Sequence, residues 1–248
     1  MAARAGKQRL DVLLLNRGLA PSRERARARI LAGDVVVGDH RVDKPGTLVA
    51  SDATIRLKGE DMPWVSRGGL KLDAALDHFG VDPRGHVALD LGASTGGFTH
   101  VLLARGATMV FAVDVGFGQL ADVLRRDPRV HVMERTHAKD LPVLDPIPTL
   151  AVVDVSFISL RMVLPHMLRV LAPQGDILAL IKPQFEVGRD HVGSGGIVRD
   201  VAARDGAVNA VMAAAAALGL MGPAPMESPV TGQKGNVEFL AHWRRAGS

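Results

Sequence analysis

Two lysines and two carboxylates stand at points of the sequence where packing alone favours apolar side chains. Asp154 and Lys182 each follow directly on an apolar run with the composition of a buried strand. Lys71 lies in the first turn of a predicted helix, where the helix dipole disfavours a cation, and Glu238 interrupts a further apolar run. A buried amine needs a carboxylate partner or must lose its charge. Two such pairs could hold a poorly acidic hydroxyl and accept its proton; the alternative is two structural ion pairs.

A glycine-rich stretch, ALDLGASTGGFTH at residues 88–100, follows the first apolar run of the same region. It lacks the Gly-Lys-Ser/Thr ending of a phosphate loop, and Ser94 stands where a dinucleotide loop has its second glycine. Asp90, two residues before Gly92, would repel a pyrophosphate. It suits a ligand with a cationic end, such as the sulfonium and ammonium groups of S-adenosylmethionine. The residues predicted to bind this cofactor are Asp90, Gly92, Ala93, Ser94, Gly96, Gly97, Asp114 and Phe157.

Two members of that set lie outside the glycine-rich stretch. Asp114 ends the next apolar run, where an acid typically accepts hydrogen bonds from ribose hydroxyls. Phe157 follows Asp154 by three residues and is expected to line the adenine or the target pocket, with a plain core role as the alternative. A structural glycine turn with solvated acids at the strand ends is the alternative for the whole set.

The elements that must position these residues form an alternating pattern. A helix with one apolar stripe is predicted over residues 66–80, and strand-like apolar runs then alternate with helical segments. Because the runs are apolar almost throughout, we expect a parallel sheet covered by helices on both faces. The carboxyl ends of such strands meet at the ligand crevice, so the charged residues above should converge there.

The first quarter of the chain has a different character. Residues 1–60 carry 12 Lys+Arg against 7 Asp+Glu, whereas the rest carries 18 against 19. Two short helices, with Ser22 and Gly33 as the cap and stop of the second, precede small strands. We expect a module of residues 1–60 that faces a polyanion, a linker of residues 61–65 and a body of residues 66–248. A solvated arginine face is the alternative. The predicted RNA-binding residues are Arg4, Lys7, Arg9, Arg23, Arg25, Arg27, Arg29 and Arg67.

Composition excludes some classes of protein. The 248 residues include no cysteine, which excludes disulfides and thiolate metal sites, and the 9 histidines show no ligand spacing, so no metal is expected. The N-terminal apolar run is too short for a signal peptide, and the alanine-rich run near residues 211–221 is too short to span a membrane. A cytoplasmic protein is therefore expected.

Six blocks give the chain a family resemblance over essentially its full length. They are VSRGGLKL (65–72), DLGASTGGFT (90–99), VDVGFGQL (113–120), DVSFISL (154–160), IKPQFEVG (181–188) and GNVEF (235–239). The body resembles the FtsJ-like ribose 2′-O-methyltransferases, and the whole chain resembles the TlyA or hemolysin A family, which joins an S-four RNA-binding domain to such an enzyme.

The resemblance implies a Rossmann-like class I methyltransferase with a seven-stranded, mostly parallel sheet, preceded by a small α+β S-four-like domain. It implies methyl transfer from S-adenosylmethionine to the 2′-hydroxyl of cytidine in small- and large-subunit ribosomal RNA, with ribosomal RNA or ribosomal subunits as partners. The Lys–Asp–Lys–Glu tetrad of the family corresponds to Lys71, Asp154, Lys182 and Glu238.

Three other functions remain as alternatives. A base N-methyltransferase is suggested by DVSF at residues 154–157, although an exocyclic amine needs no tetrad. A non-catalytic RNA-binding assembly factor would not require the acids and glycines of the loop. A pore-forming hemolysin, as the older family name suggests, would need membrane-spanning segments that the sequence does not show.

Overall fold

The computed structural model describes residues 6–58, 63–232 and 234–245. The chain divides into two compact units, Met1–Pro63 and Trp64–Ser248. Part of the linker expected at residues 61–65 lies outside the described residues. Its last two residues, Trp64 and Val65, belong to the second unit, where Trp64 is buried in the core.

The first unit packs two helices against short strands around a small apolar core. Ser22 accepts a hydrogen bond from the backbone N–H of Arg25 and so caps the second helix, and Gly33 ends it with a φ of 76°. Both features were predicted from the sequence and are confirmed. The elements are β1 (Lys7–Arg9), α1 (Leu10–Asn16), α2 (Arg23–Ala32), β2 (Val35–Val37), β3 (His40–Arg41), β4 (Leu48–Ala50) and β5 (Ile55–Leu57). Strand β1 pairs with β4, and β2 lies between β3 and β5.

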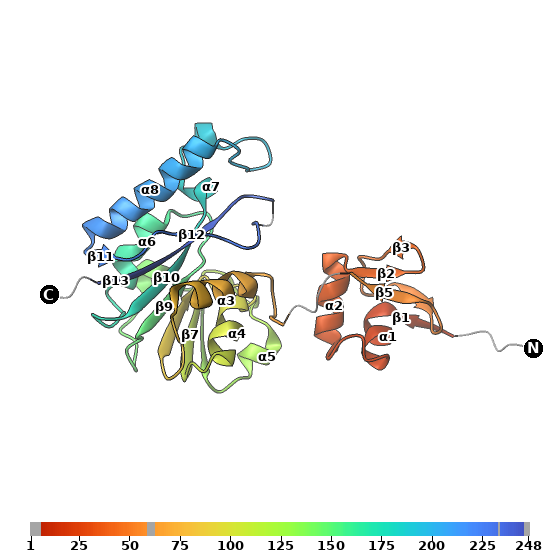
Figure 1. Ribbon diagram of the computed structural model, residues 1–248. Coiled ribbons are helices and arrows are strands. Elements are labelled where there is room, and N and C mark those ends of the chain that lie inside the picture. Colours follow the sequence, from red (N-terminus) through yellow and green to blue (C-terminus); the bar gives the residue numbers. More distant parts are fainter. Residues whose placement is uncertain (1–5, 59–62, 233, 246–248) are drawn as a thin grey trace, which may run out of the picture. The chain divides into compact units, whose positions relative to one another are not determined.

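The second unit is a large, mostly parallel sheet with helices on both faces (Figure 1). Its strands are β6 (Val87–Leu91), β7 (Met109–Asp114), β8 (Val130–Glu134), β9 (Leu150–Val153), β10 (Asp176–Ile181), β11 (Leu220–Met221), β12 (Met226–Glu227) and β13 (Phe239–Arg245). Its helices are α3 (Gly68–Phe79), α4 (Gly97–Ala104), α5 (Asp122–Arg125), α6 (Leu160–Met167), α7 (Pro183–Glu186) and α8 (Val201–Ala217), with 3₁₀ turns at Ala138–Asp140 and Arg189–His191.

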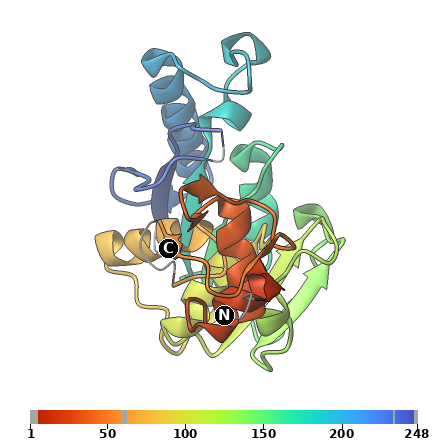
Figure 2. The ribbon, with the colours of Figure 1, turned by 90° about the vertical axis from the view of Figure 1, so that its right-hand side faces the viewer.

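Alternate residues of each central strand enter two separate cores. In β6, Leu89 and Leu91 face the core that contains α6 and α8, whereas Ala88 faces the core that contains α3, α4 and α5. Helices α3 (gold) and α8 (blue) accordingly lie well apart in both views of the unit (Figure 1 and Figure 2). Burial on both faces explains why the strands are apolar almost throughout, as predicted.

The strand order is β11-β13-β10-β9-β6-β7-β8, with β12 also paired to β13. In the described part of the chain the sheet thus has eight strands where seven were expected, because two two-residue segments, β11 and β12, pair separately with β13. The chain runs from β6 outward to β8 and then returns to the other side of β6 at β9. The order therefore reverses between β6 and β9, which is where open α/β sheets bind ligands.

Candidate active site

Strand ends bring the predicted charged residues to one edge of the sheet. Strands β6, β7, β9 and β10 are parallel, so Asp90, Asp114, Asp154 and Lys182 lie at or just after their carboxyl ends. Strand β13 runs antiparallel to β10, with Phe239 opposite Ile181. The antiparallel direction places the start of β13, and the preceding Glu238, at the same edge.

The first ion pair joins residues from neighbouring strand ends. The Nζ atom of Lys182 lies 2.6 Å from Oδ1 of Asp154 and donates a hydrogen bond of 2.9 Å to Oγ of Ser156. The Lys182 side chain is only 11% exposed and that of Asp154 23%. Screening by water is therefore weak, and the amine is held between two fixed oxygen atoms at the strand reversal.

The second ion pair joins Lys71 of α3 to Glu238, and both residues are buried. The other carboxylate oxygen of Glu238 accepts a hydrogen bond of 3.1 Å from the side-chain amide of Gln184. Gln184 lies two residues after Lys182 and so connects the second pair to the loop that carries the first. The four residues predicted from the sequence thus form two lysine–carboxylate pairs. Gln184 and Ser156 were missed, since neither residue type signals a buried ion pair.

The glycine-rich loop touches the backbone that follows β9. Gly92 has a φ of 92°, and a Cβ atom on it would lie 2.4 Å from the backbone oxygen of Asp154. A Cβ atom on Gly97, at the start of α4, would lie 2.3 Å from Oγ of Ser66. Side chains at these two positions would separate β6 from β9 and α4 from α3. Ala93 is buried in the core beside α4, and its backbone N–H donates to the oxygen of Val113.

Asp90 is fully buried at the end of β6. Its Oδ2 atom accepts a hydrogen bond of 2.6 Å from the hydroxyl of Thr99, whereas its buried Oδ1 atom has no hydrogen-bond partner among the described residues. Burial raises the pKa of Asp90 to about 7, and the nearby Asp154 and Asp114 act in the same direction. A cationic ligand group at this edge would offset the repulsion among these acids and favour the ionised form.

Asp114 fixes the shape of the loop. Its Oδ2 atom accepts a hydrogen bond from the backbone N–H of Ser94, and its Oδ1 atom accepts one from that of Gly116, both at 2.7 Å. Ser94 has a φ of 46°, a conformation that this bond helps to maintain, and its hydroxyl donates to Gln119 at 3.2 Å. Each carboxylate oxygen keeps a second lone pair, which leaves Asp114 able to accept hydrogen bonds from ligand hydroxyls.

Phe157 lies beside the Lys182 loop rather than in the core. Its side chain is 91% exposed, its φ is 65°, and its ring centroid lies 5.1 Å from that of Phe185. The Nζ atom of Lys182 lies 6.0 Å from the same Phe185 ring. The alternative of a plain core aromatic is therefore wrong, and the exposed ring stands next to the first ion pair.

The basic residues of the first unit differ in exposure. Arg9 and Arg23 both pair with Asp11, which is fully buried and was missed in the sequence. The hydrogen bond from Arg9 lowers the pKa of Asp11 to about 2. The prediction that Arg29 binds RNA is wrong. Its side chain is buried, with 7% exposed, and donates a hydrogen bond to the backbone oxygen of Lys58, so it does not belong to the expected phosphate-binding surface. Arg4 lies outside the described residues. The remaining predicted RNA-binding residues are exposed or half-buried: Lys7, Arg25, Arg27 and, in the second unit, Arg67.

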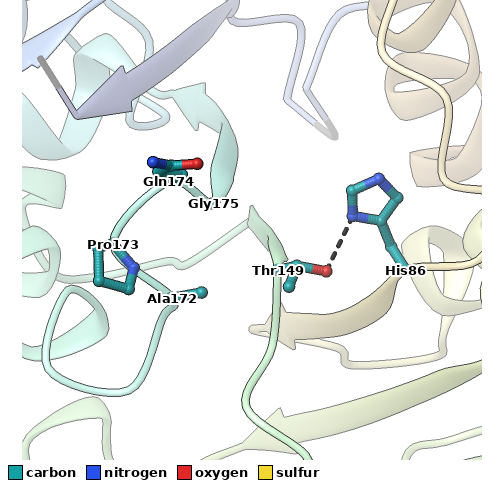
Figure 3. A pocket seen from close by; sticks show the side chains of 6 residues that line it. All are labelled: His86, Thr149, Ala172, Pro173, Gln174 and Gly175. Carbon is teal, nitrogen blue, oxygen red and sulfur yellow. Dashed lines mark hydrogen bonds between the residues drawn. The ribbon is translucent and has the colours of Figure 1, made fainter. Parts of the chain in front are cut away.

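An open pocket lies at the opposite end of the sheet, before the strands begin (Figure 3). His86 and Thr149 immediately precede β6 and β9, and their side chains are joined by a hydrogen bond of 2.9 Å. The segment 172–175 completes the pocket. It contains none of the predicted site residues, and the candidate active site is the carboxyl edge.

The described residues contain no cluster of three His, Asp or Glu side chains arranged to hold a metal ion. Within the same ranges, no helix combines the length and hydropathy that crossing a membrane requires.

Comparison with known proteins places this geometry in context. Residues 64–245 match the model of the FtsJ-like methyltransferases, and residues 8–55 match that of the S4 domain. The chain is 46% identical to the 16S/23S rRNA (cytidine-2′-O)-methyltransferase TlyA of Mycobacterium tuberculosis, over 97% of this chain and 91% of the relative. It is 39% identical to Hemolysin A of Brachyspira hyodysenteriae, over 95% and 99%. A solved hemolysin-type protein of Streptococcus thermophilus has a TM-score of 0.76 and 42% identity, and the match covers 98% of this chain and 90% of that one.

Proposed function

Because the chain belongs to the FtsJ-like methyltransferase family and carries an S4 domain before the enzyme fold, we propose that it methylates the ribose 2′-hydroxyl of cytidine in ribosomal RNA. The observation that carries the proposal is two lysine–carboxylate ion pairs at the carboxyl edge of the sheet, the half-buried Lys182–Asp154 pair beside the strand-order reversal and the buried Lys71–Glu238 pair. The nucleotide is taken from the name of the TlyA relative, which acts on 16S and 23S rRNA.

The methyl donor is S-adenosylmethionine, which supplies a methyl group on a positively charged sulfur. The fully buried Asp90, with an unpartnered oxygen atom, fits a ligand with a cationic end. Gly92 fits a ligand that lies against the backbone, because a side chain there would strike Asp154. Asp114 fits the ribose hydroxyls. The residues that would hold the cofactor also include Ser94, Gly96 and Gly97 from the loop.

The residues of the chain then act on the target hydroxyl. A ribose hydroxyl is a weak acid, so a fixed lysine beside it orients the oxygen and, in its neutral amine form, takes the proton; the charged ammonium has no lone pair and can only orient the oxygen. Lys182 is suited to this role because Asp154 and Ser156 hold its Nζ atom. The Lys71–Glu238 pair adds a second amine, which Gln184 connects to the Lys182 loop. Positioning of the two reactants supplies much of the rate.

Phe157 is assigned to the target side of the site. The sequence left the adenine pocket and the target pocket open for this residue. Its exposed ring lies beside Phe185 and the Lys182 loop, whereas the loop that would hold the cofactor follows β6. The ring therefore supports contact with the nucleotide that is methylated.

RNA is the proposed partner of the first unit. Its surface carries exposed basic side chains, and the positive excess of the chain lies in residues 1–60. Phosphate contacts of this kind supply affinity without sequence preference, so the unit would dock the enzyme while the site selects the nucleotide. An enzyme with this partner would work in the cytoplasm.

The test uses ribosomal subunits and free ribosomal RNA from a strain that lacks the enzyme. Methyl-labelled S-adenosylmethionine is added with the wild type, with Lys182→Ala or with Lys139→Ala, an exposed lysine outside the site. We expect label on a ribose 2′-oxygen, lost in Lys182→Ala and kept in Lys139→Ala.

Other outcomes select the alternatives. Label on a base would replace the proposal with an N-methyltransferase. Absence of label from protein that binds the cofactor would indicate a non-catalytic RNA-binding factor. Leakage of lipid vesicles without the cofactor would favour a hemolysin.

A further inference from the structure

The segment between β9 and α6 has little support from its own backbone. Val155, Ser156 and Phe157 form no backbone–backbone hydrogen bond with any other described residue. Phe157 also has a φ of 65°, a left-handed backbone conformation that strains a non-glycine residue. Asp154 begins this segment, so side-chain contacts must hold the loop that carries one partner of the first ion pair.

Those contacts come in order from the turn that follows β10. Lys182 donates to Ser156, and the Phe185 ring packs against the Phe157 ring. Glu186 then accepts hydrogen bonds from Ser159 and from the first residue of α6. Side chains of residues 182–186 thus contact residues 156–160 one after another and hold that segment in place.

Glu186 makes the strongest of these contacts. It is 8% exposed, its Oε2 atom accepts from the hydroxyl of Ser159 and its Oε1 atom accepts from the backbone N–H of Leu160, both at 2.6 Å. Leu160 begins α6, where the first N–H groups have no partner within the helix and the dipole favours a negative charge. Arg161 lies 3.3 Å from the carboxylate and donates to the backbone oxygen of Glu186 at 3.2 Å.

We propose that Glu186 is a positioning residue for methyl transfer. It clamps the loop after β9 to the turn after β10 and so sets the distance between Asp154 and Lys182. It also keeps Phe157 in its left-handed conformation. This role rests on the proposed function, since only a reaction at the Lys182 amine requires that distance to be fixed.

Asp176 provides a matched control. It is a buried carboxylate, 5% exposed, at the other end of β10, and it binds two basic side chains, His242 at 2.6 Å and Arg244 at 2.9 Å. Its loss should lower stability as the loss of Glu186 does, but far from the reacting groups. If Glu186 had a purely structural role, substitutions of Glu186 and of Asp176 would have similar effects on methylation.

The experiment compares Glu186→Ala, Glu186→Gln and Asp176→Asn in the full chain. Hydrogen exchange of peptides that cover residues 154–162 measures the clamp, and methylation of ribosomal subunits measures positioning. We expect faster exchange and a kcat lowered about 10- to 100-fold in Glu186→Ala, with the Kd for S-adenosylmethionine changed less than about threefold. Glu186→Gln, which keeps one acceptor oxygen, should recover much of both, and Asp176→Asn should change neither.

Each readout can overturn the inference separately. Unchanged hydrogen exchange at residues 154–162 in Glu186→Ala would show that Glu186 does not hold the loop after β9. Faster exchange with kcat within about threefold of the wild type, or an equal loss of kcat in Asp176→Asn, would reduce Glu186 to a structural residue. A wild type that methylates no RNA would refute the proposed function and with it the catalytic part of the inference, while exchange would still decide the clamp.

Discussion

Lys71 and Glu238 form a buried ion pair although they lie 167 positions apart in the chain. The pair joins two distant segments at the candidate site, since Lys71 belongs to α3 near the start of the second unit and Glu238 immediately precedes β13. A buried pair of this kind is costly to break by removing one partner, because the other charge then stays buried and unpaired.

Neutralising both partners should separate stability from catalysis. Lys71→Met or Glu238→Gln alone is expected to lower the free energy of unfolding by about 3 kcal/mol. The double variant should regain most of that loss, because neither charge remains, yet its methylation should stay at least about 100-fold below wild type. Urea denaturation and single-turnover methylation of ribosomal subunits measure the two effects. Recovery of activity in the double variant would show that the pair only supports the fold.

Gly92 should be intolerant of a single methyl group. Gly92→Ala places a Cβ atom 2.4 Å from the backbone oxygen of Asp154, which cannot move without shifting the strand end. We expect loss of S-adenosylmethionine binding by calorimetry and a stability loss of several kcal/mol. Gly80→Ala is the control, because Gly80 has a similarly positive φ of 65° but meets open space. That change should cost only about 1 kcal/mol and leave binding intact. Equal behaviour of the two variants would mean that backbone strain, and not the close approach, makes glycine necessary.

Asp90 should make the ligand-free protein less stable as the pH rises. Its pKa is raised from 3.8 to about 7 by burial, so the folded state holds a proton that the unfolded state has already lost. The stability that this proton contributes is complete below about pH 4 and disappears as the pH rises through about 7. Relative to Asp90→Asn, the wild type should therefore lose a few kcal/mol of unfolding free energy between pH 4 and pH 8.

The same rise in pH, which destabilises the ligand-free protein, should strengthen the binding of S-adenosylmethionine. Ionised Asp90 favours a cationic ligand, so the affinity of the wild type for S-adenosylmethionine should increase as the pH rises through 7, and Asp90→Asn should bind weakly at every pH. Urea denaturation and calorimetry across this range check both statements. Parallel stability curves for the two proteins would contradict the raised pKa.

Two arginines that lie two residues apart in α2, and so on different faces of the helix, should respond differently to substitution. Arg27 is exposed on α2, so Arg27→Gln should weaken RNA binding and reduce the slope of log K against log salt by about 1. Arg29 is buried, so Arg29→Gln should lower the stability of the first unit and leave the salt slope unchanged. Filter binding at several salt concentrations, with thermal unfolding, distinguishes them. An equal change of slope for both variants would mean that Arg29 contacts RNA as Arg27 does.

The sequence predicted the elements well because their signals are local. Ser22 and Gly33 mark the ends of α2 by their own chemistry, and the apolar runs before Asp154 and Lys182 require buried strands. Because parallel strands end at the same edge of a sheet, the charged residue after each run could then be predicted to lie at that edge.

The remaining features depend on contacts between distant segments. Glu186 and Gln184 are polar residues of helical or turn sequence, which are normally exposed, and only packing from elsewhere buries Glu186 and pairs Gln184 with Glu238. Arg29 was placed on the surface because an arginine run in a helix is usually solvated, whereas its face of α2 packs toward the core of the first unit.

The position of β13 has a consequence for the order in which the enzyme becomes active during synthesis. This strand lies between β10 and β11, so an interior strand of the sheet is also its last to be made. Until β13 has been made, β10 is an open edge and Lys71 has no Glu238 to pair with. A nascent chain can therefore fold its first unit and begin the second without possessing a complete site. The site of methyl transfer would in this way stay incomplete until an interior strand, made later than both of its neighbours, has been inserted into the sheet.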